Sequence, residues 1–167
     1  MNCSEEFNDL ELDNFDHFMI AEKNQETIVL DSSVIFKWFH FENEDNIETA
    51  RSLHEKAISR YFHVLIPELL LYEIINIFKY RTEIDVALLE EILKELLHIL
   101  ILIKLDSRDY INAYEISKKT NNSFYDSIYI AISEKYKAPF ITADKKLYEA
   151  LKSHNYNIVL LDDFIGS

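Results

Sequence analysis

The chain has 167 residues, of which 49% are hydrophobic and 28% charged, a balance typical of a folded globular protein and not of a disordered or fibrous one. This length suits one domain with a single core and is too short for two ordinary domains. The formal net charge of −13 disfavours tight binding of a polyanion, because nucleic-acid affinity comes largely from Lys and Arg that neutralise phosphates.

The negative charge is concentrated at the N-terminus. The stretch 1–26 holds eight acidic residues against the single cation Lys23, so it carries about seven of the net negative charges. It has no sustained helical or alternating pattern. We interpret it as an acidic N-terminal extension of a domain that runs from residue 27 to 167.

The apolar segments are too short to span a membrane. The longest run, 96–103, contains His98 and stops at Lys104, short of the roughly 20 residues that a span needs. No basic stretch followed by an apolar segment marks a secretory signal, and the single cysteine, Cys3, cannot form an internal disulfide. We therefore expect a cytoplasmic protein.

From residue 27 onwards, short apolar runs alternate with helical stretches, which is typical of βα units and a parallel sheet. The expected strands are 28–30, 63–66, 99–105, 139–142 and 157–161. The expected helices are 33–39, 47–61, 68–81, 84–98, 108–118, 126–136 and 145–153. With one Gly and two Pro, the chain offers neither a P-loop nor a dinucleotide fingerprint, and the six His show no zinc-ligand spacing.

Two acidic residues come where apolar strands stop. Asp31 directly follows Ile28-Val29-Leu30, and Asp144 comes shortly after Phe140-Ile141-Thr142. Each acid has an alternative role as the N-cap of the next helix, which Asp fills well. Strand ends of a parallel sheet, however, line the crevice where ligands bind, so the pair indicates the beginning of a site.

Two further acids lie on expected helices that are largely apolar. Glu73 shares its helix face with Leu70 and Ile77, where a buried carboxylate is costly unless a cation or hydrogen bonds compensate it. The alternative for Glu73 is an ion pair with Arg81 or a place at the helix edge. Asp126 has the alternative of a capping box with Ser123, three residues before it. The functional interpretation depends on the set, since four acids in these places are improbable as four unrelated caps.

Clustered carboxylates suit Mg²⁺ or Mn²⁺, which prefer oxygen ligands and can activate a water for hydrolysis of a phosphodiester. The proposed ligands and catalytic residues are Asp31, Glu73, Asp126 and Asp144. Three polar residues next to them in sequence or on the same helix face, Ser33, Asn76 and Thr142, are candidates for orienting an acid, a water or a phosphate oxygen.

Residues 28–164 resemble PIN-domain ribonucleases, in particular VapC-type toxins. The motifs that carry the resemblance are Leu30-Asp31-Ser32-Ser33-Val34, Glu73-Ile74-Ile75-Asn76, Tyr125-Asp126-Ser127-Ile128-Tyr129-Ile130-Ala131 and Ile141-Thr142-Ala143-Asp144-Lys145-Lys146-Leu147. The resemblance implies a three-layer α/β/α sandwich on a parallel sheet of order 3-2-1-4-5, with Mg²⁺- or Mn²⁺-dependent cleavage of RNA. It also implies a homodimer, and often an antitoxin encoded alongside.

The acidic extension is a departure from this family, whose members usually begin within a few residues of the first Asp. One hypothesis is that the extension folds over the cleft or a basic rim and lowers RNA access; a solvated tail is the simpler alternative. Basic residues expected near the mouth are weak candidates for phosphate contacts: Lys37, Arg81, Lys145 and Lys146. An aromatic stretch, Phe36, Trp38, Phe39 and Phe41, is either part of the core or a groove for a dimer or antitoxin.

Two rival functions remain open at this point. A receiver-like phosphotransfer domain also gathers acids at strand ends and would use Asp106, but the chain has Asp162 and Asp163 where a receiver has a Lys. The other rival is a non-catalytic PIN-like module that binds RNA or protein. Intact acids at all four positions disfavour this second rival.

Overall fold

Five short parallel strands form the centre of the fold. In the computed structural model, which describes residues 26–39 and 46–164, the strand order is β3-β2-β1-β4-β5. The strands are β1 (Glu26–Leu30), β2 (Phe62–Pro67), β3 (Ile101–Ile103), β4 (Phe140–Thr142) and β5 (Ile158–Leu160). The fold class and the strand order implied by the family resemblance are confirmed.

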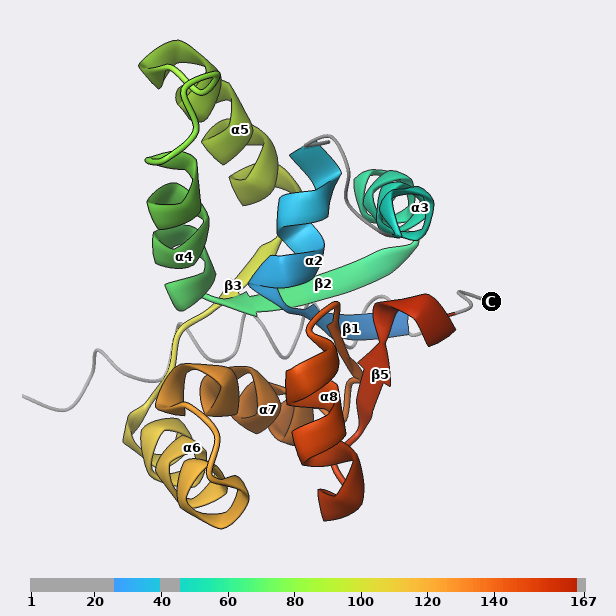
Figure 1. Ribbon diagram of the computed structural model, residues 1–167, viewed down its shortest axis with the longest axis vertical. Helices are drawn as coiled ribbons and strands as arrows, with labels where there is room; N and C mark the ends of the chain where they lie inside the picture. The colour runs from blue at the N-terminus through green and yellow to red at the C-terminus, as the bar shows by residue number, and fades with distance from the viewer. Residues whose placement is uncertain (1–25, 40–45, 165–167) are drawn as a thin grey trace, which may run out of the picture.

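Helices cover both faces of this sheet, which explains why its central strands are largely apolar (Figure 1). On one face lie α2 (Ser32–Phe36), α3 (Ile47–Ile58), α4 (Leu69–Phe78) and α5 (Val86–Ile99). On the other lie α6 (Ser107–Thr120), α7 (Phe124–Tyr136) and α8 (Lys145–Leu151). All six residues of β2 are buried, as expected for a strand between two helical layers. Within the described ranges, no helix is long and apolar enough to cross a membrane.

Several element bounds differ from the sequence-based expectation for local reasons. The strand expected at 99–105 is only three residues long, because Ile99 still belongs to α5 and Leu100 provides its C-cap. Two expected helices end in 3-10 turns, η1 (Lys37–Phe39) after α2 and η2 (Lys152–His154) after α8. A third 3-10 turn, η3 (Leu161–Asp163), follows β5.

The aromatic stretch after β1 belongs to the core. Phe36 and Trp38 are buried, and the rings of Phe36 and Phe39 both pack against Phe78 on α4. Trp38 also stacks on His54 of α3. The core alternative therefore holds for these three residues, while Phe41 lies outside the described residues.

The strand order places the β1–β4 pair at the point where the direction of winding reverses. The chain proceeds from β1 to β2 and β3 on one side, then returns to pair β4 with the other side of β1. Ligand sites in open parallel sheets lie outside the carboxyl ends of the strands at such a switch point. Helix α4 starts at this same edge because it follows the end of β2, and α7 starts there because it runs back to the beginning of β4.

Candidate active site

Asp31 lies at the carboxyl end of β1 with its side chain only 7% exposed. Its backbone carbonyl accepts hydrogen bonds from Val34 and Ile35 and so begins α2, but its side chain makes no capping bond. Instead, the hydroxyls of Ser33 and Thr142 both donate to Asp31 Oδ2 at 2.6 Å. The capping alternative therefore does not account for the Asp31 carboxylate.

The same two hydroxyls connect β1 to the segment after β4. Ser33 Oγ accepts a hydrogen bond from the backbone N–H of Ala143 at 3.0 Å, and Thr142 Oγ1 accepts one from the N–H of Asp144 at 3.0 Å. Each hydroxyl thus donates to the carboxylate of Asp31 and accepts from a backbone N–H of the segment after β4. Ser33 and Thr142 hold Asp31 and fix where the backbone of Asp144 lies.

Asp144 is exposed and caps α8. Its Oδ1 accepts hydrogen bonds from the backbone N–H groups of Lys146 and Leu147 at 2.8 and 3.1 Å. The capping role considered for Asp144 is therefore present. Both bonds use the same oxygen, so Oδ2 takes no part in the cap and is the oxygen that a ligand would engage.

Glu73 is half-buried on α4, and its partner is a tyrosine. The hydroxyl of Tyr129 on α7 donates to Glu73 Oε2 at 2.5 Å. Arg81, the ion-pair partner considered for Glu73, instead lies over the ring of Phe36, with its guanidinium carbon 5.4 Å from the ring centre. Glu73 thus lies half-buried with a phenol as its partner, between the buried face and the helix-edge position that were considered for it.

Sequence reasoning assigned no role to Tyr129. The available signal was a phenol within an otherwise apolar helix, because a buried Tyr hydroxyl usually finds a hydrogen-bond partner. Burial, followed by the adjacent Glu73 carboxylate, raises the pKa of Tyr129 well above its usual range, so the phenol keeps its proton and donates it.

Asp126 lies in the first turn of α7 and interacts with Ser123. Ser123 Oγ donates to Asp126 Oδ2 at 2.6 Å and accepts from the backbone N–H of Asp126 at 3.0 Å. Half of the expected capping box is thus present, since the Ser123 hydroxyl accepts from the Asp126 backbone N–H. The other half differs, because the Asp126 carboxylate accepts from the Ser123 hydroxyl instead of from the Ser123 backbone N–H. This cap does not prevent the carboxylate from acting on its neighbours electrostatically.

Asp31, Glu73 and Asp126 influence one another through their charges. Burial is the main cause that raises the pKa of Asp31, and the Asp126 carboxylate raises it further, against the lowering effect of the Ser33 and Thr142 hydroxyls. Burial also raises the pKa of Glu73, with additional repulsion from Asp31 and Asp126, while the hydroxyls of Tyr129 and Ser32 oppose the rise. Three acids from β1, α4 and α7 therefore form one electrostatically coupled group.

This acidic group fits a hard divalent cation in its chemistry. Its donors are all oxygens, and burial and mutual repulsion leave negative charge that a cation would compensate. As the side chains stand, no three His, Cys, Asp or Glu residues in the described part of the chain are close enough to hold one ion together. Mg²⁺ usually keeps several waters and binds directly to only one or two carboxylates, so the group fits an ion held partly through water.

Four other residues predicted for the site are exposed, half-buried or paired with a residue outside it. Asn76 is exposed on α4, and Lys146 is exposed on α8. Lys145 forms an ion pair with Asp162, Nζ to Oδ2 at 3.4 Å. Lys37 is half-buried in η1.

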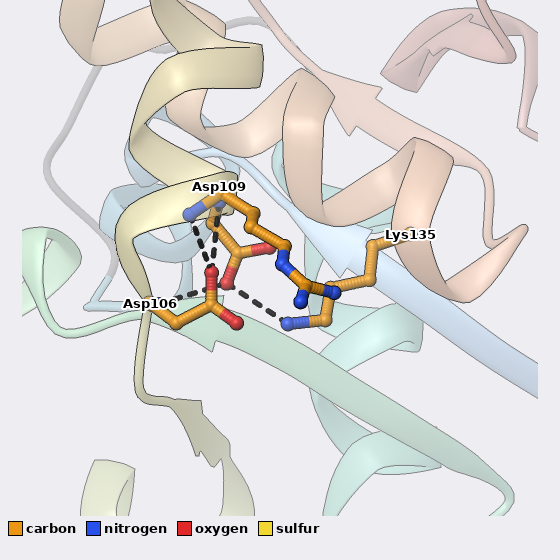
Figure 2. A network of polar contacts seen from close by, with 4 residues as sticks. Asp106, Asp109 and Lys135 are labelled. Atoms are coloured by element: carbon orange, nitrogen blue, oxygen red, sulfur yellow. Dashed lines mark hydrogen bonds and ion pairs between the residues drawn. The ribbon is translucent and has the colours of Figure 1, made fainter.

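Asp106, the residue that a receiver would use, has a structural role. Its Oδ1 accepts from the backbone N–H groups of Arg108 and Asp109 at 2.7 and 3.1 Å, which caps α6. Asp109 in turn accepts from the backbone N–H of Asp106 at 3.0 Å and forms an ion pair with Lys135 at 2.9 Å (Figure 2). This network joins the beginning of α6 to the end of α7, away from Asp126 at the beginning of α7.

A model of the PIN domain family matches residues 28–152. The chain belongs to the PIN domain family. The matched range includes all four candidate acids of this PIN domain and ends just after α8, which confirms the family resemblance of the sequence motifs. Comparison of the sequence with curated proteins finds no match.

Solved structures share the fold of this PIN domain at low sequence identity. PAE2754 from Pyrobaculum aerophilum superimposes with a TM-score of 0.60 at 16% identity, over 83% of this chain and 91% of the other. A toxin-antitoxin complex from Klebsiella pneumoniae gives a TM-score of 0.61 at 12% identity, over 82% and 99%. Mycobacterium tuberculosis VapC20, described as a sarcin-ricin loop cleaving toxin, gives 0.57 at 14% identity, over 77% and 95%.

Proposed function

We propose that this PIN domain is an endoribonuclease of the VapC toxin type that hydrolyses RNA phosphodiester bonds with Mg²⁺ or Mn²⁺. The observation that carries the proposal is the coupled group of Asp31, Glu73 and Asp126 at the carboxyl edge of the sheet. Asp31 is buried and Glu73 and Asp126 are partly buried. Neighbouring carboxylates in such surroundings destabilise the fold without a cation, so their presence in a PIN domain is best explained by a ligand of positive charge.

We assign each of the four acids a role according to its surroundings. When bound, the cation supplies a water of lowered pKa and positive charge at the scissile phosphate. Asp31 is held rigidly by two hydroxyls and anchors the site. Glu73 and Asp126 approach from α4 and α7, on opposite faces of the sheet, and Asp144 contributes its Oδ2 from the start of α8. Ser33 and Thr142 act as orienting residues.

The choice of RNA rests on the family resemblance and on the relative described as a sarcin-ricin loop cleaving toxin. Positive charge gives little help, because Lys145 is paired with Asp162 and Arg81 lies over Phe36. Exposed tyrosines stand directly before two of the acids: Tyr72 before Glu73 is 63% exposed, and Tyr125 before Asp126 is 59% exposed. Aromatic rings of this kind stack on unpaired bases. We therefore propose that Tyr72 and Tyr125, with Lys37, Arg81, Lys145 and Lys146 in a minor role, contact single-stranded segments of RNA.

Partners and location follow from the same comparison. Toxin-antitoxin complexes are among the similar structures, so we propose a cognate antitoxin for this chain. We further propose a homodimer, as the family resemblance implies, and a cytoplasmic location. The first two are measurable from the mass of the complex purified with its neighbouring gene product.

The deciding experiment measures cleavage of assorted RNAs with Mn²⁺ and with EDTA. We expect metal-dependent cleavage by the native chain and a loss of at least about 100-fold in Asp126→Asn, more than the roughly 10- to 100-fold typical of residues that only orient a ligand. Glu115→Gln is the matched control, because Glu115 is exposed on α6. Cleavage that survives EDTA, or full activity of Asp126→Asn, would refute the proposal.

One observation favours a second candidate, a PIN-like module that binds RNA without cutting it. In the described residues the acids do not form a three-ligand cluster as they stand. That candidate predicts RNA binding by the native chain with no cleavage at any Mn²⁺ concentration, and equal binding by Asp126→Asn.

A further inference from the structure

We infer that Tyr129 is a positioning residue of the active site: its hydroxyl holds the Glu73 carboxylate in the orientation that binds the divalent cation. This inference rests on the proposed function and adds a residue to it. It concerns a side chain that makes no contact with substrate and acts only through Glu73.

The first support is the hydrogen bond itself. Tyr129 donates to Glu73 Oε2 at 2.5 Å, a distance typical of a strong bond from a hydroxyl to an ionised carboxylate. The bond joins positions 56 residues apart in the chain. It also joins α4 and α7, which cover opposite faces of the sheet, so it crosses from one helical layer to the other at the carboxyl edge (Figure 1).

The second support is that the tyrosine cannot easily move. Its side chain is 1% exposed, and its ring stacks on that of Phe140 in β4, with the ring centres 5.7 Å apart and the planes 17° from parallel. A ring fixed in this way presents its hydroxyl at one place. The Glu73 side chain, by contrast, has three rotatable bonds and is only partly buried, so its carboxylate needs an external restraint to hold one orientation.

The third support is that this hydrogen bond engages one of the two carboxylate oxygens of Glu73 and not the other. Tyr129 uses Oε2 and leaves Oε1 out of this bond, so Oε1 can face a ligand, with the Ser32 hydroxyl also next to the Glu73 carboxylate. Asp31 shows a similar division, because Ser33 and Thr142 both donate to its Oδ2 at 2.6 Å, whereas its Oδ1 receives a longer hydrogen bond of 3.5 Å from Ser32. In both acids one oxygen is held by protein hydroxyls, which is how outer-shell groups usually orient metal-binding carboxylates.

The test is Tyr129→Phe, which keeps the ring and its stacking on Phe140 and removes only the hydroxyl. Mn²⁺ affinity is measured by isothermal titration calorimetry, and cleavage is measured over a range of Mn²⁺ concentrations. We expect the affinity to fall by about 10- to 100-fold, with the maximal rate largely restored at saturating Mn²⁺. Tyr114→Phe, at an exposed position on α6, is the control and should bind Mn²⁺ like the native chain.

A double-mutant cycle separates positioning from a general structural role. If Tyr129 acts through Glu73, then Tyr129→Phe causes no further loss of Mn²⁺ affinity when introduced into Glu73→Ala. Thermal unfolding is recorded for each variant. A lowered Tm with unchanged Mn²⁺ affinity, or equal losses in the native and Glu73→Ala backgrounds, would overturn the inference while leaving the nuclease proposal intact. Failure of the native chain to bind Mn²⁺ would overturn both.

Discussion

The buried carboxylate of Asp31 destabilises the folded chain when it is ionised. Burial and the charge of Asp126 raise its pKa, so the folded chain binds the Asp31 proton more tightly than the unfolded chain does. The free energy of unfolding therefore falls as the pH rises from the unfolded pKa, near 4, through the raised folded value, and it stays lowered above that. Glu73 acts in the same direction.

Asp31→Asn removes this charge and keeps an oxygen that accepts from Ser33 and Thr142. We expect the variant to be more stable than the native chain at neutral pH in EDTA, with Tm higher by roughly 2–4 °C for each 1 kcal/mol of relieved repulsion. The difference should disappear below about pH 4, where the carboxyl is protonated in both states. Mn²⁺ should stabilise only the native chain. Thermal unfolding across the pH range, with and without Mn²⁺, measures all three effects; a less stable variant in EDTA at neutral pH would contradict this account.

At this scale, the sequence predicted the acids better than their partners. The acids were found because carboxylates interrupt apolar patterns at Asp31 and Glu73. The hydroxyl of Tyr129 was missed because its partner lies on another helix, 56 positions away, and the spacing of neighbouring residues cannot indicate such a contact. Thr142 could be named as a neighbour of Asp144, but its bond to Asp31 spans 111 positions of the chain and appears only once β1 and β4 pair.

At the scale of a helix, Asp144 combines a cap with a candidate catalytic charge, and the two roles can be separated. Asn caps a helix about as well as Asp does, whereas Ala loses the cap at a cost of about 0.5–2 kcal/mol. We expect Asp144→Asn to unfold at nearly the native temperature and Asp144→Ala to unfold earlier, while both lose Mn²⁺-dependent RNA cleavage. If Asp144→Asn cleaves RNA like the native chain, Asp144 is only the cap of α8.

The α6 cap provides the opposite case, an acid with a structural role and none in the site. Asp106→Ala removes the acceptor for two backbone N–H groups, so we expect a small loss in the free energy of unfolding. Urea unfolding measures this loss. Cleavage at the Mn²⁺ optimum should stay within about 2-fold of native, within the approximate additivity of distant sites. A large loss of activity, or phosphorylation of Asp106 by a small phosphodonor, would instead favour the receiver-like alternative.

The helices and strands were largely predictable because their signals are local. Hydrophobic periodicity placed all five strands and the seven described α-helices, and Asp85 and Asp106 cap helices within two residues of the expected starts. Errors occurred where an apolar run continues across a boundary, as at Ile99 and Leu100, because a run of apolar residues does not show where a helix ends and a strand begins.

For the molecule as a whole, the parallel topology explains how acids separated by up to 113 positions can act together. Reversal of the winding at β1 and β4 brings Asp31 and the segment before Asp144 to one edge, where two hydroxyls join them. Helices that start at that edge add Glu73 and Asp126 from opposite faces. Pairing order cannot be deduced from the individual strands, so the strand order was expected from the family resemblance, whereas the places of Asp31 and Asp144 at strand ends already predicted a shared site.

The overall charge bears on the proposed binding of RNA by such an acidic protein. Residues 1–25 lie outside the described residues and contain seven acids and one Lys, close to half of the net charge of −13. Repulsion between this segment and the phosphates of RNA should lower the association rate. We expect a chain lacking residues 1–25 to bind single-stranded RNA more tightly, by up to about 10-fold at low salt, with the advantage shrinking as salt screens the charges.

A full-length variant with the seven acids changed to Asn or Gln separates charge from occlusion. If repulsion is the cause, this neutralised chain matches the truncated chain at every salt concentration. If instead the apolar side chains of Phe15, Phe18 and Met19 cover the RNA site, only truncation increases the affinity, and the increase persists at high salt because apolar contacts are not screened. Equal RNA affinity and cleavage by all three chains would show that residues 1–25 are a solvated tail with no part in RNA access.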